Sequence, residues 1–184
     1  MTIRACGLMA LALPAVMGAA KQNTGPHFQT SDRCIACHNE LTTASGEDVS
    51  IGFNWRASMM ANSSRDPYWQ AGVRRETIDH PHAAEHIEDE CSVCHMPIPR
   101  YQAKLQGKPG KVFAHLPFAD DKKLGKEAAD GVDCSVCHQI SAEKLGTKES
   151  FNGGFVVEAP ASGGKRPEYG PFDLDQGQIR IMQT

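Results

Sequence analysis

The sequence predicts a mainly α-helical fold with much irregular loop, and the composition and helix signals lead to that prediction. Leu, Ile, Val and Phe are sparse for 184 residues, while 17 glycines and 11 prolines interrupt regular elements. The helix signals are short, and no set of segments is convincing as a sheet. The polypeptide alone therefore offers a thin core, and chains of this kind usually recruit disulfides, metals or cofactors.

The first helix signal covers residues 53–65 and ends near Asn62. Asp66 followed by Pro67 is an N-cap and first-turn signature, which predicts a second helix over residues 68–79. Further helices are predicted over residues 82–95 and 121–129.

Glycines and prolines mark the segments between these helices. Gly25 and Pro26 predict an irregular stretch over residues 21–33. A cluster of prolines and glycines predicts a loop after residue 95, and six glycines predict an irregular surface stretch after Ser141.

Cysteines carry the chemistry of this sequence. Six of the seven form Cys-x-x-Cys pairs, and a histidine follows each pair directly. The motifs are Cys34, Cys37 and His38; Cys91, Cys94 and His95; and Cys134, Cys137 and His138. This pentapeptide is the attachment signature of c-type haem. The thiols add to the porphyrin vinyl groups and the histidine binds iron as the proximal ligand, so the sequence predicts three covalent haems c.

Other uses of Cys-x-x-Cys pairs fit less well. A zinc site needs four ligands, usually two pairs, and three pairs leave one pair without a partner. A thioredoxin-like site uses one pair on an alternating strand and helix frame, which is not visible here. Disulfides are compatible with an oxidising compartment, but close pairs with a trailing histidine are a poor way to cross-link a small fold.

Acidic residues stand one or two positions ahead of each motif: Asp32, Glu90 and Asp133. A carboxylate there suits the N-terminus of a helical turn, where backbone N–H groups are exposed. We therefore expect each motif to lie on a short helical turn that begins near the acidic residue.

The N-terminus resembles a secretory signal. Residues 1–20 contain Arg4, an apolar run and a small-residue cleavage site, and cleavage removes the seventh cysteine, Cys6. The apolar run is shorter than the roughly 20 residues that span a bilayer, and a lipid anchor at Cys6 is a minor alternative. The sequence predicts a signal peptide over 1–20, one multihaem cytochrome c domain over 21–184 without an integral membrane span, and a periplasmic or otherwise extracytoplasmic location.

Several segments resemble multihaem c-type cytochromes, specifically those similar to the tetrahaem electron carriers of hydroxylamine oxidation. They are the three motifs, the helix Trp55–Ala61, the turn Asp66–Trp69 and the segment Gly131–His138. The resemblance spans about residues 28–184 and implies an exported protein of short helices packed around covalent haems that pass single electrons. The chain departs from this family in having three sites, and its ending at Thr184 suggests a C-terminally truncated member with further haems missing.

The sixth ligand of each iron decides between an electron carrier and a haem enzyme, because a filled site only moves electrons. His115 is a candidate, since an uncompensated imidazole in its apolar surroundings is costly. His80, which Pro81 constrains, and His27, ahead of the first motif, are further candidates. His82 and His86, spaced i, i+4, are weaker candidates, because the same helix face could be a solvated patch or an adventitious metal pair.

Met60 is the remaining candidate ligand. The family that the chain resembles commonly offers a histidine from the corresponding helix, and this sequence has Met59 and Met60 there. Thioether sulfur can replace imidazole, and the alternative is that both methionines pack on a porphyrin face.

Candidate ligands outnumber sites, so the sequence favours an electron-transfer protein with six-coordinate irons. The alternative is a multihaem oxidoreductase that acts on a small nitrogen compound at one five-coordinate haem. A net charge of −3 argues against nucleic acid as a partner. Haem propionates add negative charge, so we expect redox protein partners with a basic docking face.

Overall fold

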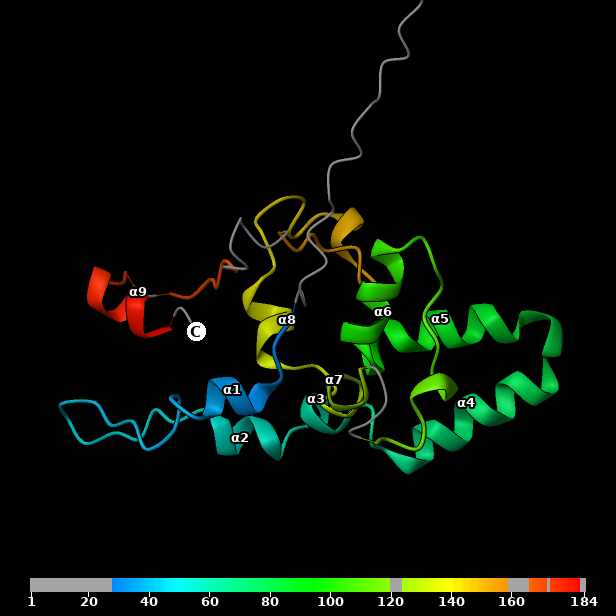
Figure 1. The fold of residues 1–184 in the computed structure, drawn as a ribbon, viewed down its shortest axis with the longest axis horizontal. Helices are drawn as coiled ribbons and strands as arrows, with labels where there is room; N and C mark the ends of the chain where they lie inside the picture. The colour runs from blue at the N-terminus through cyan, green and yellow to red at the C-terminus, as the bar shows by residue number, and fades with distance from the viewer. Residues whose placement is uncertain (1–27, 120–123, 159–165, 172, 183–184) are drawn as a thin grey trace, which may run out of the picture.

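The computed structural model of the chain, drawn in Figure 1, describes residues 28–119, 124–158, 166–171 and 173–182. Its α-helices are α1 (Ser31–Ile35), α2 (Gly52–Arg56), α3 (Met59–Asn62), α4 (Pro67–Asp79), α5 (Ala84–His95), α6 (Pro97–Leu105), α7 (Gly125–Ala129), α8 (Cys134–His138) and α9 (Gln176–Met182). Three single-turn 3₁₀-helices accompany them: η1 (Pro81–Ala83), η2 (Phe113–His115) and η3 (Lys148–Ser150).

The predicted fold class is confirmed at the level of secondary structure. Helices dominate the described residues, and strand pairing there is limited to two isolated bridges, between Thr42 and Asp48 and between Ile140 and Val157. None of the described helices is both long enough and apolar enough to cross a bilayer. The predicted signal peptide over 1–20 lies outside the described residues.

Helices α4 and α5 form the longest regular element, an antiparallel hairpin that extends to one side of the molecule (Figure 1). The N-cap prediction is confirmed, because the Asp66 carboxylate accepts a hydrogen bond of 2.9 Å from the Tyr68 N–H and Pro67 occupies the first turn. At the far end, α4 stops at Asp79 and η1 turns the chain back. The hairpin therefore carries the end of α5, where the second motif lies, back to the centre of the molecule.

The single helix predicted over residues 53–65 is wrong, because the chain forms α2 and α3 with a break between them. Ser58 takes an extended conformation (φ −77°, ψ 159°), and its hydroxyl accepts the Ala61 N–H at 3.3 Å. A serine that caps a new helix in this way competes with the continuation of the old one.

The loop predicted after residue 95 is also wrong at its beginning, since α6 covers Pro97–Leu105. Pro97 and Pro99 stand in the first turn, where a helix does not use the backbone N–H groups that proline lacks. Ile98 is fully buried and holds the turn in the core. Of the helix predicted over 121–129, the described part forms α7, which begins at Gly125.

The core consists of two small clusters, which agrees with the predicted thin core. The first joins the start of the described chain to α6 and α8: Phe28, Ile98, Val136 and Val157. The second lies between α4, the end of α5, η2 and α7: Val73, Met96, Val112 and Ala128. The second and third motifs border these clusters, so the core positions both of them.

Candidate haem-attachment sites

All three motifs lie on helical turns. The first motif (residues 34–38) runs from α1 into the following turn, where the Cys37 and His38 N–H groups both donate to the Cys34 carbonyl, at 3.1 and 2.9 Å. The second (residues 91–95) ends α5, and the third (residues 134–138) forms α8. Residues three apart on a helical turn share a side, so each pair of thiols faces one way.

The expectation that each helical turn begins near its acidic residue is confirmed at the first and third motifs. The Asp133 carboxylate accepts the Val136 N–H at 2.7 Å, and Asp133 is 1% exposed. Asp32 lies in the first turn of α1, which begins at Ser31, although the N-cap residue Thr30 makes no side-chain cap. For Glu90 the expectation is wrong, because α5 begins at Ala84 and Glu90 lies within it.

Burial changes the ionisation of the Asp133 carboxyl. Desolvation raises the pKa of Asp133 to about 8, against the opposing effects of its hydrogen bonds from Val136 and Ser135. The neighbouring carboxylate of Asp130 adds to the rise. The third motif thus begins at a carboxyl group that is mostly protonated at neutral pH.

None of the six motif cysteines forms a disulfide. Helix α1 packs against α8, which brings Cys34 and Cys134 together. Hydrogen bonding between these two thiols raises the pKa of Cys34 and lowers the pKa of Cys134. The first and third motifs are therefore neighbours in space, although about a hundred residues separate them in the sequence.

Two of the three motif histidines have their ring orientation fixed by a backbone carbonyl. The Nδ1 atom of His95 lies 2.7 Å from the Ser63 oxygen, and that of His138 lies 2.6 Å from the Tyr169 oxygen. A carbonyl oxygen only accepts hydrogen bonds, so Nδ1 carries the proton in each ring and Nε2 keeps its lone pair. This is the tautomer that binds a metal through Nε2, oriented as metal-binding histidines usually are.

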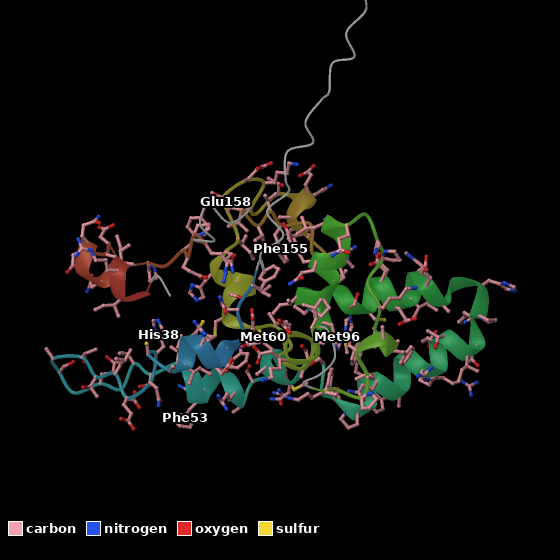
Figure 2. The ribbon with its side chains drawn as sticks, viewed as in Figure 1. His38, Phe53, Met60, Met96, Phe155 and Glu158 are labelled. Atoms are coloured by element: carbon pink, nitrogen blue, oxygen red, sulfur yellow. The ribbon has the colours of Figure 1, made fainter. Side chains whose placement is uncertain are left out.

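His38 differs from the other two motif histidines. It is exposed, and no such hydrogen bond holds its ring among the described residues. Figure 2 places it beside α1. The start of α2 packs against the same motif, because a Cβ atom added to Gly52 would lie 2.9 Å from the Ile35 side chain.

Beside the second motif, an aromatic ring lies flat on the histidine. The rings of Trp69 and His95 are 4.2 Å apart at their centroids and 5° from parallel. The buried indole N–H of Trp69 has no acceptor among the described residues, so packing in the second core cluster, and not a hydrogen bond, holds this ring.

A cavity of about 180 Å³ adjoins the third motif, and its surface is mostly apolar. Met60 and Trp55 line it together with Cys134, Cys137 and His138. Met60 is 52% exposed, and Figure 2 shows it at the middle of the molecule. The Trp55 indole donates to the Val132 oxygen at 3.0 Å, which ties α2 to the segment that leads into the motif. The fold thus brings the candidate ligand Met60 to the third motif.

A larger cavity of about 400 Å³ adjoins the second motif. Cys91 and His95 line one side, and the residues from α4 and its N-cap that complete it are Asp66, Tyr68, Trp69, Gly72, Val73 and Glu76. Apart from Cys91 and His95, none of these residues carries an imidazole or a sulfur atom. Burial raises the pKa of Cys91 and the neighbouring carboxylates of Glu76 and Glu90 add to the rise.

The other candidate ligands lie away from both cavities. His80, His82 and His86 are exposed near the turn between α4 and α5, and His80 is 3.8 Å from Glu76. His115 is half-buried in η2, beside residues that pack on the second core cluster. His27 lies outside the described residues. The distal roles of these histidines stay predictions.

Among the described residues, no three His, Cys, Asp or Glu side chains come together in a group that could hold a metal ion. A zinc site needs four such ligands around one point. Each pair of thiols has its own histidine, which follows it directly in the chain.

The residues that hold the motif histidines are not predictable from the sequence. Ser63 and Tyr169 act through backbone carbonyls, which every residue possesses, so no sequence signal marks them. The sequence predicts Trp69 at the start of the helix over residues 68–79. Its position on the His95 ring results from the packing of α4 against α5.

Comparison with known proteins adds no relative: no family model, no curated protein and no solved structure matches the chain.

Proposed function

We propose that the protein is an extracytoplasmic electron-transfer protein that carries three covalent haems c and relays single electrons between redox partners. The three pentapeptide motifs support the haem assignment, because the attachment chemistry needs two thiols and a histidine at this spacing. The observation that carries it is the state of the histidines: in His95 and His138 a backbone carbonyl holds the proton on Nδ1 and leaves Nε2 for iron.

The residues around the motifs fit the proposed cofactor. Cys34, Cys91 and Cys134, with their partner cysteines, would form the thioether bonds, and the motif histidines would bind iron. Mostly apolar cavities adjoin the second and third motifs, where a porphyrin needs apolar walls. When bound, each haem supplies a one-electron couple between ferric and ferrous iron.

The contact between Cys34 and Cys134 supports transfer between haems. Haems attached at neighbouring cysteines belong to adjoining sites, so an electron would pass between the first and third sites over a short distance. A chain with −3 net charge and six added propionates would dock on basic redox partners.

Intact mass spectrometry of the protein from a host that attaches haem c tests the proposal. We expect the polypeptide plus three haems, and one haem fewer when Cys91 and Cys94 are both changed to alanine. A matched double change at Ser92 and Val93, which lie between these cysteines, should keep all three haems. A product without covalent haem, from a host that matures a known cytochrome c in parallel, contradicts the proposal.

The second cavity favours one alternative function, a multihaem oxidoreductase that acts on a small nitrogen compound. Its lining offers the iron of the second haem one imidazole, that of His95, and none of the other lining residues is a histidine or methionine. Tyr68, Asp66 and Glu76 are polar groups that could contact a small ligand there. An open iron position is what such catalysis requires.

Carbon monoxide distinguishes the two functions. A carrier with three six-coordinate irons keeps its reduced spectrum when the gas is added, whereas an open second site binds it stoichiometrically. The double variant at Cys91 and Cys94, which lacks the second haem, identifies the site. Carbon monoxide binding that disappears in this variant supports the oxidoreductase; binding that persists places the open iron elsewhere.

A further inference from the structure

The stacked pair of Trp69 and His95 sets the second motif apart from the third. Both motif histidines donate Nδ1–H to a carbonyl, but of the two only His95 has an aromatic ring stacked on its face in the described residues. We propose that Trp69 is a positioning residue of the second haem, which fixes the rotation of the His95 ring and stabilises the ferric state. This inference rests on the proposed function, because it concerns the cofactor that the function requires.

Two contacts at right angles to each other determine the orientation of the ring. The hydrogen bond from Nδ1 to the Ser63 oxygen, 2.7 Å long, acts in the plane of the imidazole. The indole, at 4.2 Å and 5° from parallel, acts on its face. A ring bound only at Nδ1 can still turn about that bond, and the stack removes this freedom. Among the described residues, His138 has its carbonyl partner but no stacked ring, so it lacks the second restraint.

Packing, and not a local hydrogen bond, supplies the force that holds Trp69 in place. Its side chain contacts the second core cluster, in which Val73 of the same helix is 3% exposed. The indole N–H is buried without an acceptor among the described residues, so the ring would not be drawn away from His95 by a polar partner. Trp55, by contrast, is held by its bond to the Val132 oxygen.

The stack also has an electrostatic consequence. Ferric iron draws electron density from its histidine, and the ring becomes more positive than it is on ferrous iron. The electron-rich face of an indole stabilises positive charge on a neighbouring ring. Trp69 therefore favours the ferric state of the second haem and lowers its reduction potential relative to a site without the stack.

Trp69→Leu tests the proposal, because leucine keeps apolar volume and removes the aromatic face. We expect the reduction potential of one haem to rise and its ferric electron paramagnetic resonance signal to broaden, as the ring samples more orientations. Trp69→Phe, which retains an aromatic face, should restore most of both properties. Only preparations whose mass shows three haems are compared. A parent protein without covalent haem would contradict the proposed function itself, so the two failures are distinguishable.

Trp55→Leu is the matched control, since it removes the other tryptophan of the chain from the third cavity. It should leave the signal and potential of the second haem unchanged. The double variant at Cys91 and Cys94 identifies which signal belongs to that haem. If Trp69→Leu retains three haems with the same potentials and line widths as the parent, the proposal is overturned.

A measurement on the parent protein covers the case in which Trp69→Leu does not take up the second haem. In reduced, carbon monoxide-saturated protein, every iron is diamagnetic, and the ring protons of an iron-bound histidine are shifted far upfield. We expect nuclear Overhauser contacts between the Trp69 indole protons and those of His95. Their absence from a spectrum that contains both sets of resonances overturns the proposal as well.

Discussion

The Val132 N–H donates a hydrogen bond of 3.0 Å to the Met60 carbonyl oxygen, which joins α3 to the segment immediately before the third motif. The neighbouring residue, Gly131, makes the contact possible. It has φ +67°, and a Cβ atom there would lie 2.6 Å from the Met60 oxygen and 3.0 Å from the Ala61 oxygen. The third motif and the helix that carries Met60 are thus held together backbone to backbone.

Gly131→Ala should separate these two segments. A left-handed conformation costs a residue with a side chain about 1 kcal/mol, and an overpacked contact adds about 1–3 kcal/mol. We expect the free energy of unfolding of the haem-loaded protein to fall by about 2–4 kcal/mol, measured by guanidinium denaturation and far-ultraviolet circular dichroism.

Gly46→Ala is the control for this substitution. Gly46 has φ +85°, but nothing lies within 4 Å of its added Cβ, so only the conformational cost of about 1 kcal/mol should appear. If the free energy of unfolding falls equally in the two variants, the close approach of α3 to Gly131 adds nothing to the cost of the substitution.

Met60 should affect the haem proposed at the third motif in particular, because it lines the cavity of that motif. If its sulfur is the sixth ligand, the third haem has a higher potential than haems with two histidines, since methionine favours ferrous iron. Met60→His should then lower the potential of that haem and abolish the sulfur-to-iron charge-transfer band near the red end of the ferric spectrum. Spectroelectrochemical titration measures both.

Met59→Leu is the control, because Met59 is the adjacent methionine, is 77% exposed and does not line that cavity. It should leave the band and all potentials unchanged. A parent protein without the band, whose potentials Met60→His also leaves unchanged, would show that Met60 only packs on the porphyrin and that a histidine such as His27 or His86 takes the site.

The fold class and the helix from Tyr68 to Asp79 were predictable because their signals are local. An aspartate followed by proline specifies a helix start whatever surrounds it, and Asp66 caps α4 as expected. The break at Ser58 and the helix through Pro97 and Pro99 were not predicted, because the same residue types are compatible with either outcome. Tertiary contacts determine which outcome occurs: Ile98 is fully buried in α6, and the Val132 N–H holds α3.

In the candidate site, too, some features are predictable from the sequence and others are not. Spacing alone predicts the cysteines and histidines of the motifs as haem-attachment residues, since the proposed chemistry depends on distance along one helical turn. The surroundings of His95 depend on contacts across 26 and 32 residues, with Trp69 and Ser63, which no local pattern encodes.

Asp133 should make stability depend on pH. Burial raises the pKa of Asp133 to about 8 in the folded chain, from an ordinary value of 3.8. Between these values the folded state binds the proton that the unfolded state has released, so stability falls as pH rises, by up to about 1.4 kcal/mol per pH unit. The stabilisation that protonation of Asp133 gives the folded state is complete below about pH 4 and is lost as the pH rises past 8.

Asp133→Asn removes this titration and keeps an oxygen that can cap Val136. We expect the decline of unfolding free energy between pH 4 and 8 to become shallower than in the parent, in denaturant titrations at several pH values. The same substitution at Asp130, which only adds to the shift, should have a smaller effect. Parallel pH profiles for the parent and Asp133→Asn would contradict the assignment.

The proposed haems should be required for the chain to fold. The two core clusters hold four buried apolar residues each, and large apolar side chains such as Phe53 (70% exposed) remain uncovered. A variant with all six motif cysteines changed to alanine should therefore lose cooperative thermal unfolding and give a poorly dispersed NMR spectrum, as small domains do without their metal. The control is Cys6→Ala in the full-length precursor, which changes a cysteine outside the motifs and should leave haem content and cooperative unfolding as in the parent. A well-dispersed spectrum from the haem-free variant would mean that the polypeptide core suffices, and that the cofactors occupy a scaffold already folded.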